Sequence, residues 1–269
     1  MENKRLRKSK NVSAADMEKL SLAAKRQLSD AVNRQLAETI KLPAEYEDIS
    51  GEIKEKGLEI LKTGYAINEY CSVLAGTYEI KAAVEDICDI VSHVCCKAEV
   101  YTEKSGIPII RKIPGLRIFV KIDEERFVFA LLNVLLNAFE NSFEGTKIKV
   151  SVSKTSKFAK VTVADYGIGM GEETLSRCCE PLFSEKKGRN GLGLGLCMAR
   201  HFAVENGGRI KILSALGKGT EVSLFIPLAA EEDYLLGTKN PVSEIFGQEP
   251  SPADIVFSGA TCAKPDEKL

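Results

Sequence analysis

The chain has 269 residues, a length that accommodates about two domains. Its 37 basic and 38 acidic residues give a formal net charge of -1, which excludes the global positive field that a nucleic-acid-coating protein needs. No uncharged apolar run approaches the roughly 18 to 20 residues of a membrane helix. The basic amino terminus leads into Asp16 and Glu18 rather than into an apolar segment, so we expect no secretory signal, no transmembrane segment and a cytoplasmic location.

Two helices are expected before the first break in the sequence. One covers residues 13–42 and ends at Pro43. The other covers about 53–74, where an aliphatic residue recurs every seven positions, as in a coiled coil or helix bundle. The heptad positions are Ile53, Ile60, Ile67 and Leu74. These helices predict a hairpin over 1–77, which would either pair two copies of the chain or pack on its own domain.

The next segment predicts a mixed helix and strand domain over 78–228. An apolar stripe from Val84 to Ala98 predicts a third helix, with His93 off the stripe and on the surface. Runs rich in β-branched and aromatic residues then predict strands at 108–113, 116–122, 147–153, 159–164, 209–213 and 221–226.

Helices are expected between these strands at about 124–142 and 193–206. Short connections join two pairs of strands, so the sheet should be largely antiparallel, with helices on one face. The predicted fold class is therefore α+β, a two-layer α/β sandwich preceded by a helical hairpin. Residues 229–269 hold four of the nine prolines and no sustained period, so we expect them to be extended or disordered.

The eight cysteines form no C-x-x-C motif, and the two histidines, His93 and His201, add no zinc-binding pattern. We expect reduced thiols that behave as small apolar side chains.

Three asparagines mark the helix RFVFALLNVLLNAFENS. Asn133, Asn137 and Asn141 recur at i, i+4 positions within an otherwise apolar segment, so their amides line either a polar cavity or the solvent. An amide oxygen is a good ligand for Mg²⁺ when phosphates supply the negative charge. The stripe is therefore a candidate wall of a metal-nucleotide site.

Two glycine-rich motifs follow. Asp165 stands at the end of a predicted strand, where a carboxylate can accept the exocyclic N–H of adenine, and Gly167 and Gly169 would let a planar ligand approach the backbone. The same motif also occurs in plain turns. Further along, Gly191 and Gly193 open an apolar helix, whose free N–H groups can bind phosphate. The spacing is neither a Rossmann fingerprint nor a Walker A motif.

The order of these motifs resembles the ATP-binding domain (GHKL) of sensor histidine kinases, gyrase-type topoisomerases, heat-shock chaperones of the ninety-kilodalton class and mismatch-repair ATPases. The resemblance covers about residues 78–228 and rests on LLNVLLNAFENS, DYGIGM, EPLFSEKKG, NGLGLGL and GKGTEVSLFIPL. It implies a Bergerat-type fold, with ATP and Mg²⁺ as cofactors.

The resemblance also implies roles for individual residues. Asn137 would be the magnesium ligand, Asn133 a phosphate-side residue and Asn141 a further residue of the same wall. Asp165 would anchor adenine, with Gly167 and Gly169 as its backbone neighbours.

The remaining implied roles belong to the lid and to the segments beside it. Phe183 and Lys186 would lie in a mobile lid over roughly 170–190, where Lys186 meets the terminal phosphates. Gly191 and Gly193 would cradle phosphates, and Thr220 would reach the adenine end through its hydroxyl or a water.

Within this superfamily the sequence favours the kinases. Asn133 stands where the gyrase and chaperone members carry a glutamate that activates water, so water attack is poorly assisted. A sensor kinase presents an acceptor histidine in its amino-terminal hairpin, but residues 1–92 contain no histidine, and alignment on Pro43 places Glu38 in that slot.

Three functions follow from this combination. The chain would phosphorylate a partner such as a response regulator in trans, or act as a nucleotide-dependent pseudokinase that binds a partner kinase or response regulator. A serine kinase resembling anti-sigma factors is the third alternative, against which Asn133 argues.

Overall fold

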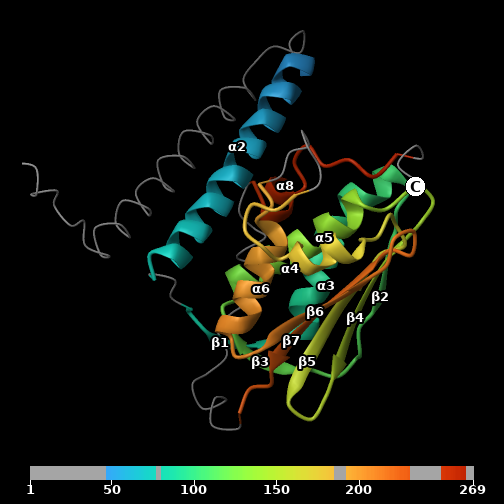
Figure 1. Ribbon diagram of the computed structural model, residues 1–269. Coiled ribbons are helices and arrows are strands. Elements are labelled where there is room, and N and C mark those ends of the chain that lie inside the picture. The colour runs from blue at the N-terminus through green and yellow to red at the C-terminus, as the bar shows by residue number, and fades with distance from the viewer. Residues whose placement is uncertain (1–46, 77–79, 185–191, 231–249, 265–269) are drawn as a thin grey trace, which may run out of the picture.

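The computed structural model describes residues 47–76, 80–184, 192–230 and 250–264 (Figure 1). The predicted helix at 13–42 and the position of Glu38 lie outside these residues.

Helix α2 spans Glu47–Leu74 and so covers the predicted helix at 53–74, beginning earlier. One face packs on the domain, because Leu58 and Leu61 are buried and the ring of Tyr65 stacks on that of Phe129 with centroids 5.1 Å apart. The heptad positions from residue 60 onward lie on the opposite face of the helix and are largely exposed. Their exposed fractions are 50% for Ile60, 47% for Ile67 and 69% for Leu74. The helix therefore packs on its own domain, and the pairing of two copies of the chain through the heptad positions stays a prediction.

The helix predicted from Val84 onward begins later than its apolar stripe suggested. Val84 lies in strand β1 (Ala83–Asp86), paired with Lys121, and helix α3 spans Ile87–Thr102. The Asp86 carboxylate accepts a hydrogen bond from the main-chain N–H of Cys88 at 3.1 Å, so it caps α3 and fixes its start. A short 3₁₀ helix, Glu103–Ser105, follows.

The main sheet has five strands in the order β2-β4-β5-β7-β6. The strands are β2 (Ile109–Lys112), β4 (Ile148–Lys154), β5 (Phe158–Ala164), β7 (Thr220–Pro227) and β6 (Arg209–Ser214). Only β2 and β4 pair in parallel, which confirms a largely antiparallel sheet. The strand predicted at 116–122 forms as β3 (Phe119–Ile122) but pairs with β1 in a separate sheet.

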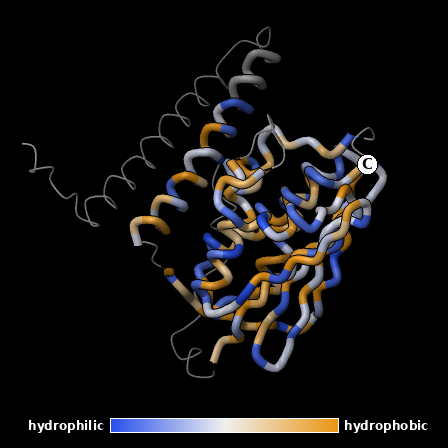
Figure 2. The backbone as a smooth tube through the Cα atoms, viewed as in Figure 1, coloured by the Kyte–Doolittle hydropathy of each residue, from blue (hydrophilic) through white to orange (hydrophobic). Residues whose placement is uncertain are grey.

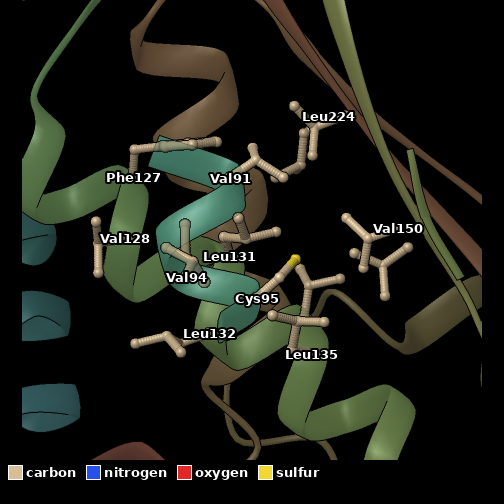
Figure 3. Close-up of a cluster of buried hydrophobic side chains, with 14 of the residues drawn as sticks. Val91, Val94, Cys95, Phe127, Val128, Leu131, Leu132, Leu135, Val150 and Leu224 are labelled. Atoms are coloured by element: carbon tan, nitrogen blue, oxygen red, sulfur yellow. The ribbon is translucent and has the colours of Figure 1, made fainter. Parts of the chain in front are cut away.

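Helices α3, α4 (Glu124–Glu140) and α6 (Gly195–Glu205) lie over one face of this sheet (Figure 1), and the short α5 spans Glu172–Arg177. Hydrophobic and hydrophilic residues alternate along the strands (Figure 2), and the hydrophobic ones face the helices. Phe127, Leu131 and Leu135 of α4 belong to the same buried cluster as Val150 and Leu224 of the sheet (Figure 3). Burying each such side chain stabilises the fold by about 1.5 to 3 kcal/mol. The predicted α+β sandwich is therefore confirmed.

Residues 250–264 are folded, so the expectation of an extended or disordered tail is wrong for this segment. Helix α8 (Pro252–Val256) begins with a capping box in which Ser251 and Asp254 satisfy each other's backbone N–H. Proline is tolerated at the first position of a helix because its missing N–H would have no partner there. The four-proline composition therefore did not exclude a helix at this point.

This carboxy-terminal segment joins α2 to the helical layer. Phe257 stacks on Tyr101 of α3, with ring centroids 5.3 Å apart, and Ile255 packs with Leu58 and Leu61 of α2. The Ser258 hydroxyl donates to the Glu55 carbonyl at 3.0 Å. Tertiary burial rather than local periodicity holds this five-residue helix, which is why the sequence pattern did not show it.

No helix in the described residues combines the length and apolar character that a membrane crossing requires. All eight cysteines are free thiols, as expected.

Candidate nucleotide-binding site

Helix α4 carries the three asparagines predicted to form one wall. Asp123 caps its start by accepting from the Arg126 N–H at 3.2 Å, and Asn141 caps its end. The three asparagines are of intermediate exposure. Asn133 donates to the Phe129 carbonyl at 2.8 Å, and Asn141 donates to the Asn137 carbonyl at 2.6 Å and to its amide oxygen at 3.2 Å. These bonds engage the amide N–H groups of Asn133 and Asn141 and the amide oxygen of Asn137.

Asp165 follows β5 and is 95% buried, with an exposed fraction of 5%. One carboxylate oxygen accepts from the Gly167 N–H at 3.0 Å and from the Thr220 N–H at 3.1 Å. The Asp165 N–H in turn donates to the Thr220 carbonyl at 2.9 Å. The carboxylate is therefore held rigidly between the ends of β5 and β7 before any ligand arrives.

The loop after Asp165 is built against the end of α4. The Ile168 N–H donates to the Asn141 carbonyl at 2.9 Å. A Cβ atom on Gly167 would lie 1.6 Å from the same carbonyl oxygen, so only glycine permits this approach. The contact brings the Asp165 loop and the asparagine stripe together, as the sequence predicted.

Two further glycines seat this loop on the β6–β7 hairpin. Gly169 has φ +70° and Gly219 φ +79°, conformations that side chains rarely adopt. A Cβ atom on Gly169 would also lie 2.1 Å from the Ala215 carbonyl oxygen. The hairpin thereby places Thr220, which is 6% exposed, beside Asp165.

Ser214 is a residue of this region that the sequence reasoning missed. Its hydroxyl oxygen accepts from the Met170 N–H at 2.8 Å and lies 2.9 Å from the Thr220 hydroxyl. A serine at the end of a strand is an ordinary turn residue, so its position after the predicted strand 209–213 carried no functional signal.

The described part of the predicted lid contains α5 and Phe183. The Arg177 guanidinium stacks over the Phe183 ring at 4.3 Å from its centroid. Gly193, with φ +64°, lies so close to the Phe183 backbone that a Cβ atom would be 2.4 Å from its carbonyl oxygen. The Leu182 N–H also donates to the Gly193 carbonyl at 3.1 Å. Phe183 and Gly193 therefore lie together, whereas Lys186 and Gly191 lie outside the described residues.

The glycine-rich helix start reaches the asparagine stripe through Gly195. A Cβ atom at this position would lie 3.0 Å from the Asn133 amide oxygen. The first residue of α6 thus contacts the first asparagine of α4. The structure therefore gathers Asn133, Asn137, Asn141 and the Asp165 loop around one region, with Gly193 and Phe183 joined at the entrance to α6.

Comparison with known proteins agrees with this geometry. Residues 122–230 match the family model of the histidine kinase-, DNA gyrase B-, and HSP90-like ATPases. A curated relative, the sensor-like histidine kinase SenX3 of Mycolicibacterium smegmatis, is 33% identical over 147 residues, which are 53% of this chain and 38% of that protein. The histidine protein kinase DivJ of Caulobacter vibrioides is 28% identical over 189 residues, which are 69% of this chain and 31% of that protein. The chain thus spans about a third of the length of these relatives.

Solved structures share the fold. Full-length ShkA in complex with AMPPNP matches with a TM-score of 0.67 and 24% identity, over 81% of this chain and 47% of that one. A catalytic domain of the histidine kinase ThkA matches with a TM-score of 0.50 and 25% identity, over 55% and 97% respectively.

The family match and the sandwich fold support a GHKL-type ATP-binding domain of the sensor histidine kinase type.

Proposed function

We propose that this domain binds Mg-ATP as part of a cytoplasmic signal-transduction protein of the sensor histidine kinase type and transfers the terminal phosphate to a partner in trans. The observation that carries the proposal is the buried Asp165 carboxylate, fixed by two backbone N–H groups and joined to the α4 asparagines through the Gly167–Asn141 contact. A buried carboxylate at the end of a strand is suited to accept a hydrogen bond from an exocyclic amine. Water cannot replace this hydrogen bond in a desolvated site.

The asparagine stripe fits a magnesium ion that is bound together with phosphates. Asn137 supplies a hard, uncharged amide oxygen, which suits Mg²⁺ when the nucleotide carries the negative charge. We assign Asn137 to the metal and Asn133 and Asn141 to the neighbouring wall. When bound, the ion neutralises charge on the terminal phosphates.

The other site residues take the roles that the family resemblance implies. Gly167 and Gly169 line the base, Gly191 and Gly193 cradle phosphates, and Thr220 reaches the adenine end. Phe183 and Lys186 belong to a lid that closes on the nucleotide.

Transfer to a protein acceptor is favoured over hydrolysis by the chemistry of Asn133. A neutral amide cannot take a proton from water, and its nitrogen is already engaged with the Phe129 carbonyl. The described site residues thus offer no general base at this position.

The acceptor is assigned to a partner because residues 1–92 contain no histidine. A response regulator is the partner that a kinase of this type would phosphorylate. The same absence favours a second candidate function, a pseudokinase whose nucleotide-bound state binds a partner kinase or response regulator without transfer.

We also propose that residues 1–77 form a hairpin that pairs two copies of the chain. The exposed heptad seam of α2 supports this, because the seam repeats every seven residues and lies on the face opposite the domain contact. Residues 78–228 then form the ATP-binding domain.

Calorimetric titration with ATP and Mg²⁺ tests the site. Asn137→Ala and Asp165→Ala should each weaken binding by at least roughly tenfold, about 1.4 kcal/mol. Asn206→Ala is a matched control, because Asn206 also donates to a carbonyl one turn earlier, at 2.8 Å, but lies at the far end of α6. Unchanged affinity in both site variants would refute the assignment.

Labelled ATP separates the two candidate functions. Label that appears on an added response regulator, and is lost with Asp165→Ala, supports the kinase. Nucleotide-dependent association without any label on the partner supports the pseudokinase.

A further inference from the structure

Ser214 lies at the centre of a small hydrogen-bond network beside the proposed base pocket. It ends β6 and stands directly opposite Thr220, the first residue of β7. Its hydroxyl oxygen accepts from the Met170 N–H at 2.8 Å, contacts the Gly219 carbonyl at 2.9 Å and contacts the Thr220 hydroxyl at 2.9 Å. One side chain thus joins the Asp165 loop, the β6–β7 turn and the start of β7.

The direction of the Ser214–Thr220 bond follows from counting protons. A serine hydroxyl has one proton, and a carbonyl oxygen can only accept. Ser214 must therefore donate to the Gly219 carbonyl. If Ser214 donated to Thr220 instead, its oxygen and the Gly219 carbonyl oxygen would lie 2.9 Å apart without a proton between them. The Thr220 hydroxyl must then donate its own proton to Ser214. With its proton committed, Thr220 can only accept from anything else that approaches it.

Asp165 adds to the same pattern. Its carboxylate accepts from the Thr220 N–H and the Gly167 N–H, and it lies across the strand end from the Thr220 side chain. Both functional groups at this end of the pocket therefore present acceptors. A ligand group that approaches these oxygens must donate to them, directly or through a water, because two acceptor oxygens that face each other in a buried site repel.

We propose that Ser214 is a positioning residue that sets the purine specificity of the site by holding the Thr220 hydroxyl as an acceptor. A purine with an exocyclic amine, as in adenine, supplies the N–H donors that this end requires. A purine with a carbonyl at the same ring position, as in hypoxanthine or guanine, places an acceptor against these acceptors, and the N–H that it gains at the neighbouring ring nitrogen N1 lies one ring position away from the adenine amine. This inference rests on the proposed function, nucleotide binding. It adds a chemical reason why the site would select adenine over other purines.

Inosine triphosphate is the probe for this proposal, because its base has the shape of adenine with the exocyclic amine replaced by a carbonyl and the adjacent ring nitrogen N1 protonated. Calorimetry with Mg²⁺ and each nucleotide gives the ratio of dissociation constants for the inosine and adenosine forms. We expect this ratio to be at least about tenfold in the native protein, since a site built to accept an N–H from the exocyclic position rejects the analogue that carries an acceptor there. In Ser214→Ala the Thr220 hydroxyl is free to rotate and donate, so the ratio should fall at least about threefold.

Two variants separate this role from a merely structural one. Ser214→Thr keeps the hydroxyl and should retain the native ratio. Ser223→Ala is the matched control, because Ser223 pairs with the Thr162 hydroxyl at 3.1 Å within the same sheet but away from the Asp165 loop. Its ratio should be native.

Thr220→Val provides a test if Ser214→Ala folds poorly. It removes the hydroxyl that Ser214 orients, so the ratio should fall, and adding Ser214→Ala should change it no further. Equal weakening of both nucleotides in Ser214→Ala and Thr220→Val, with the ratio unchanged, would overturn the proposal. A native protein that binds ATP and inosine triphosphate equally well would overturn it as well, while leaving the proposed function intact. Failure of the native protein to bind either nucleotide would overturn both.

Discussion

The carbonyl oxygen of Asn141, at the end of α4, occupies the position that a side chain on Gly167 would take. The two residues are joined by this close approach and by the Ile168 N–H that donates to the same carbonyl at 2.9 Å. The asparagine helix α4 and the Asp165 loop are thereby held in one arrangement. The close approach of the Asp165 loop to α4 therefore depends on the absence of a side chain at Gly167.

The first prediction follows from this contact. Gly167→Ala should weaken Mg-ATP binding by at least roughly tenfold, because the added methyl group would displace the Asp165 loop from α4. Gly171→Ala is the matched control, since a Cβ atom there meets nothing within 4 Å. Calorimetry on both variants, with circular dichroism to confirm folding, provides the measurement. Native affinity in Gly167→Ala would show that the approach is not needed.

A second prediction concerns the lid. Nucleotide should slow amide hydrogen exchange over residues 171–184, because the family resemblance implies a lid that closes on the nucleotide, and Phe183 gives this segment an anchor against Gly193. Phe183→Ala should reduce this protection while leaving exchange in β4 and β5 unchanged. Exchange that is identical with and without Mg-ATP would contradict the closing lid.

The third prediction tests the carboxy-terminal segment. Phe257 is 3% exposed and packs against Tyr101 and Phe139, so Phe257→Ala should lower the free energy of unfolding by about 3 to 5 kcal/mol. Thr261→Ala, at an exposed position of the same segment, should change it by less than about 0.5 kcal/mol. Urea denaturation measures both values. Equal stability in the two variants would mean that the segment does not hold the fold.

Some parts of the fold and of the candidate site could be predicted from the sequence, and others could not. The asparagine stripe and Asp165 were predictable because each motif needs residue types at a spacing that one helix or one strand end imposes. Val84 was misplaced because an apolar residue fits a strand as well as a helical stripe, and the capping bond of Asp86 decides between them. Ser214 and Phe257 could not be predicted, because their partners are distant in the sequence and lie in other elements of the fold.

A fourth prediction concerns pH. Burial lowers the pKa of His201 on α6 from its usual value, with nearby Arg126 lowering it further and Glu205 opposing the effect. The folded protein therefore binds a proton less readily than the unfolded chain, so this contribution to stability is present above about pH 6.5 and is lost as pH falls. His201→Gln should have a shallower loss of stability on acidification, measured by urea denaturation at several pH values. Parallel acid profiles for the native and variant proteins would contradict this assignment.

The last prediction follows from the missing histidine. The purified protein should bind Mg-ATP but should not phosphorylate residues 1–92 of its own chain, because formation of phosphohistidine needs a nucleophilic imidazole and none is present there. If Glu38 stands in the acceptor slot, its carboxylate is a much weaker nucleophile at phosphorus and would give a labile acyl phosphate. Incubation with labelled ATP, followed by mapping of the label, measures this directly. Acid-labile label on the isolated protein within residues 1–92 would refute the prediction, and label that appears only on an added partner would agree with transfer in trans.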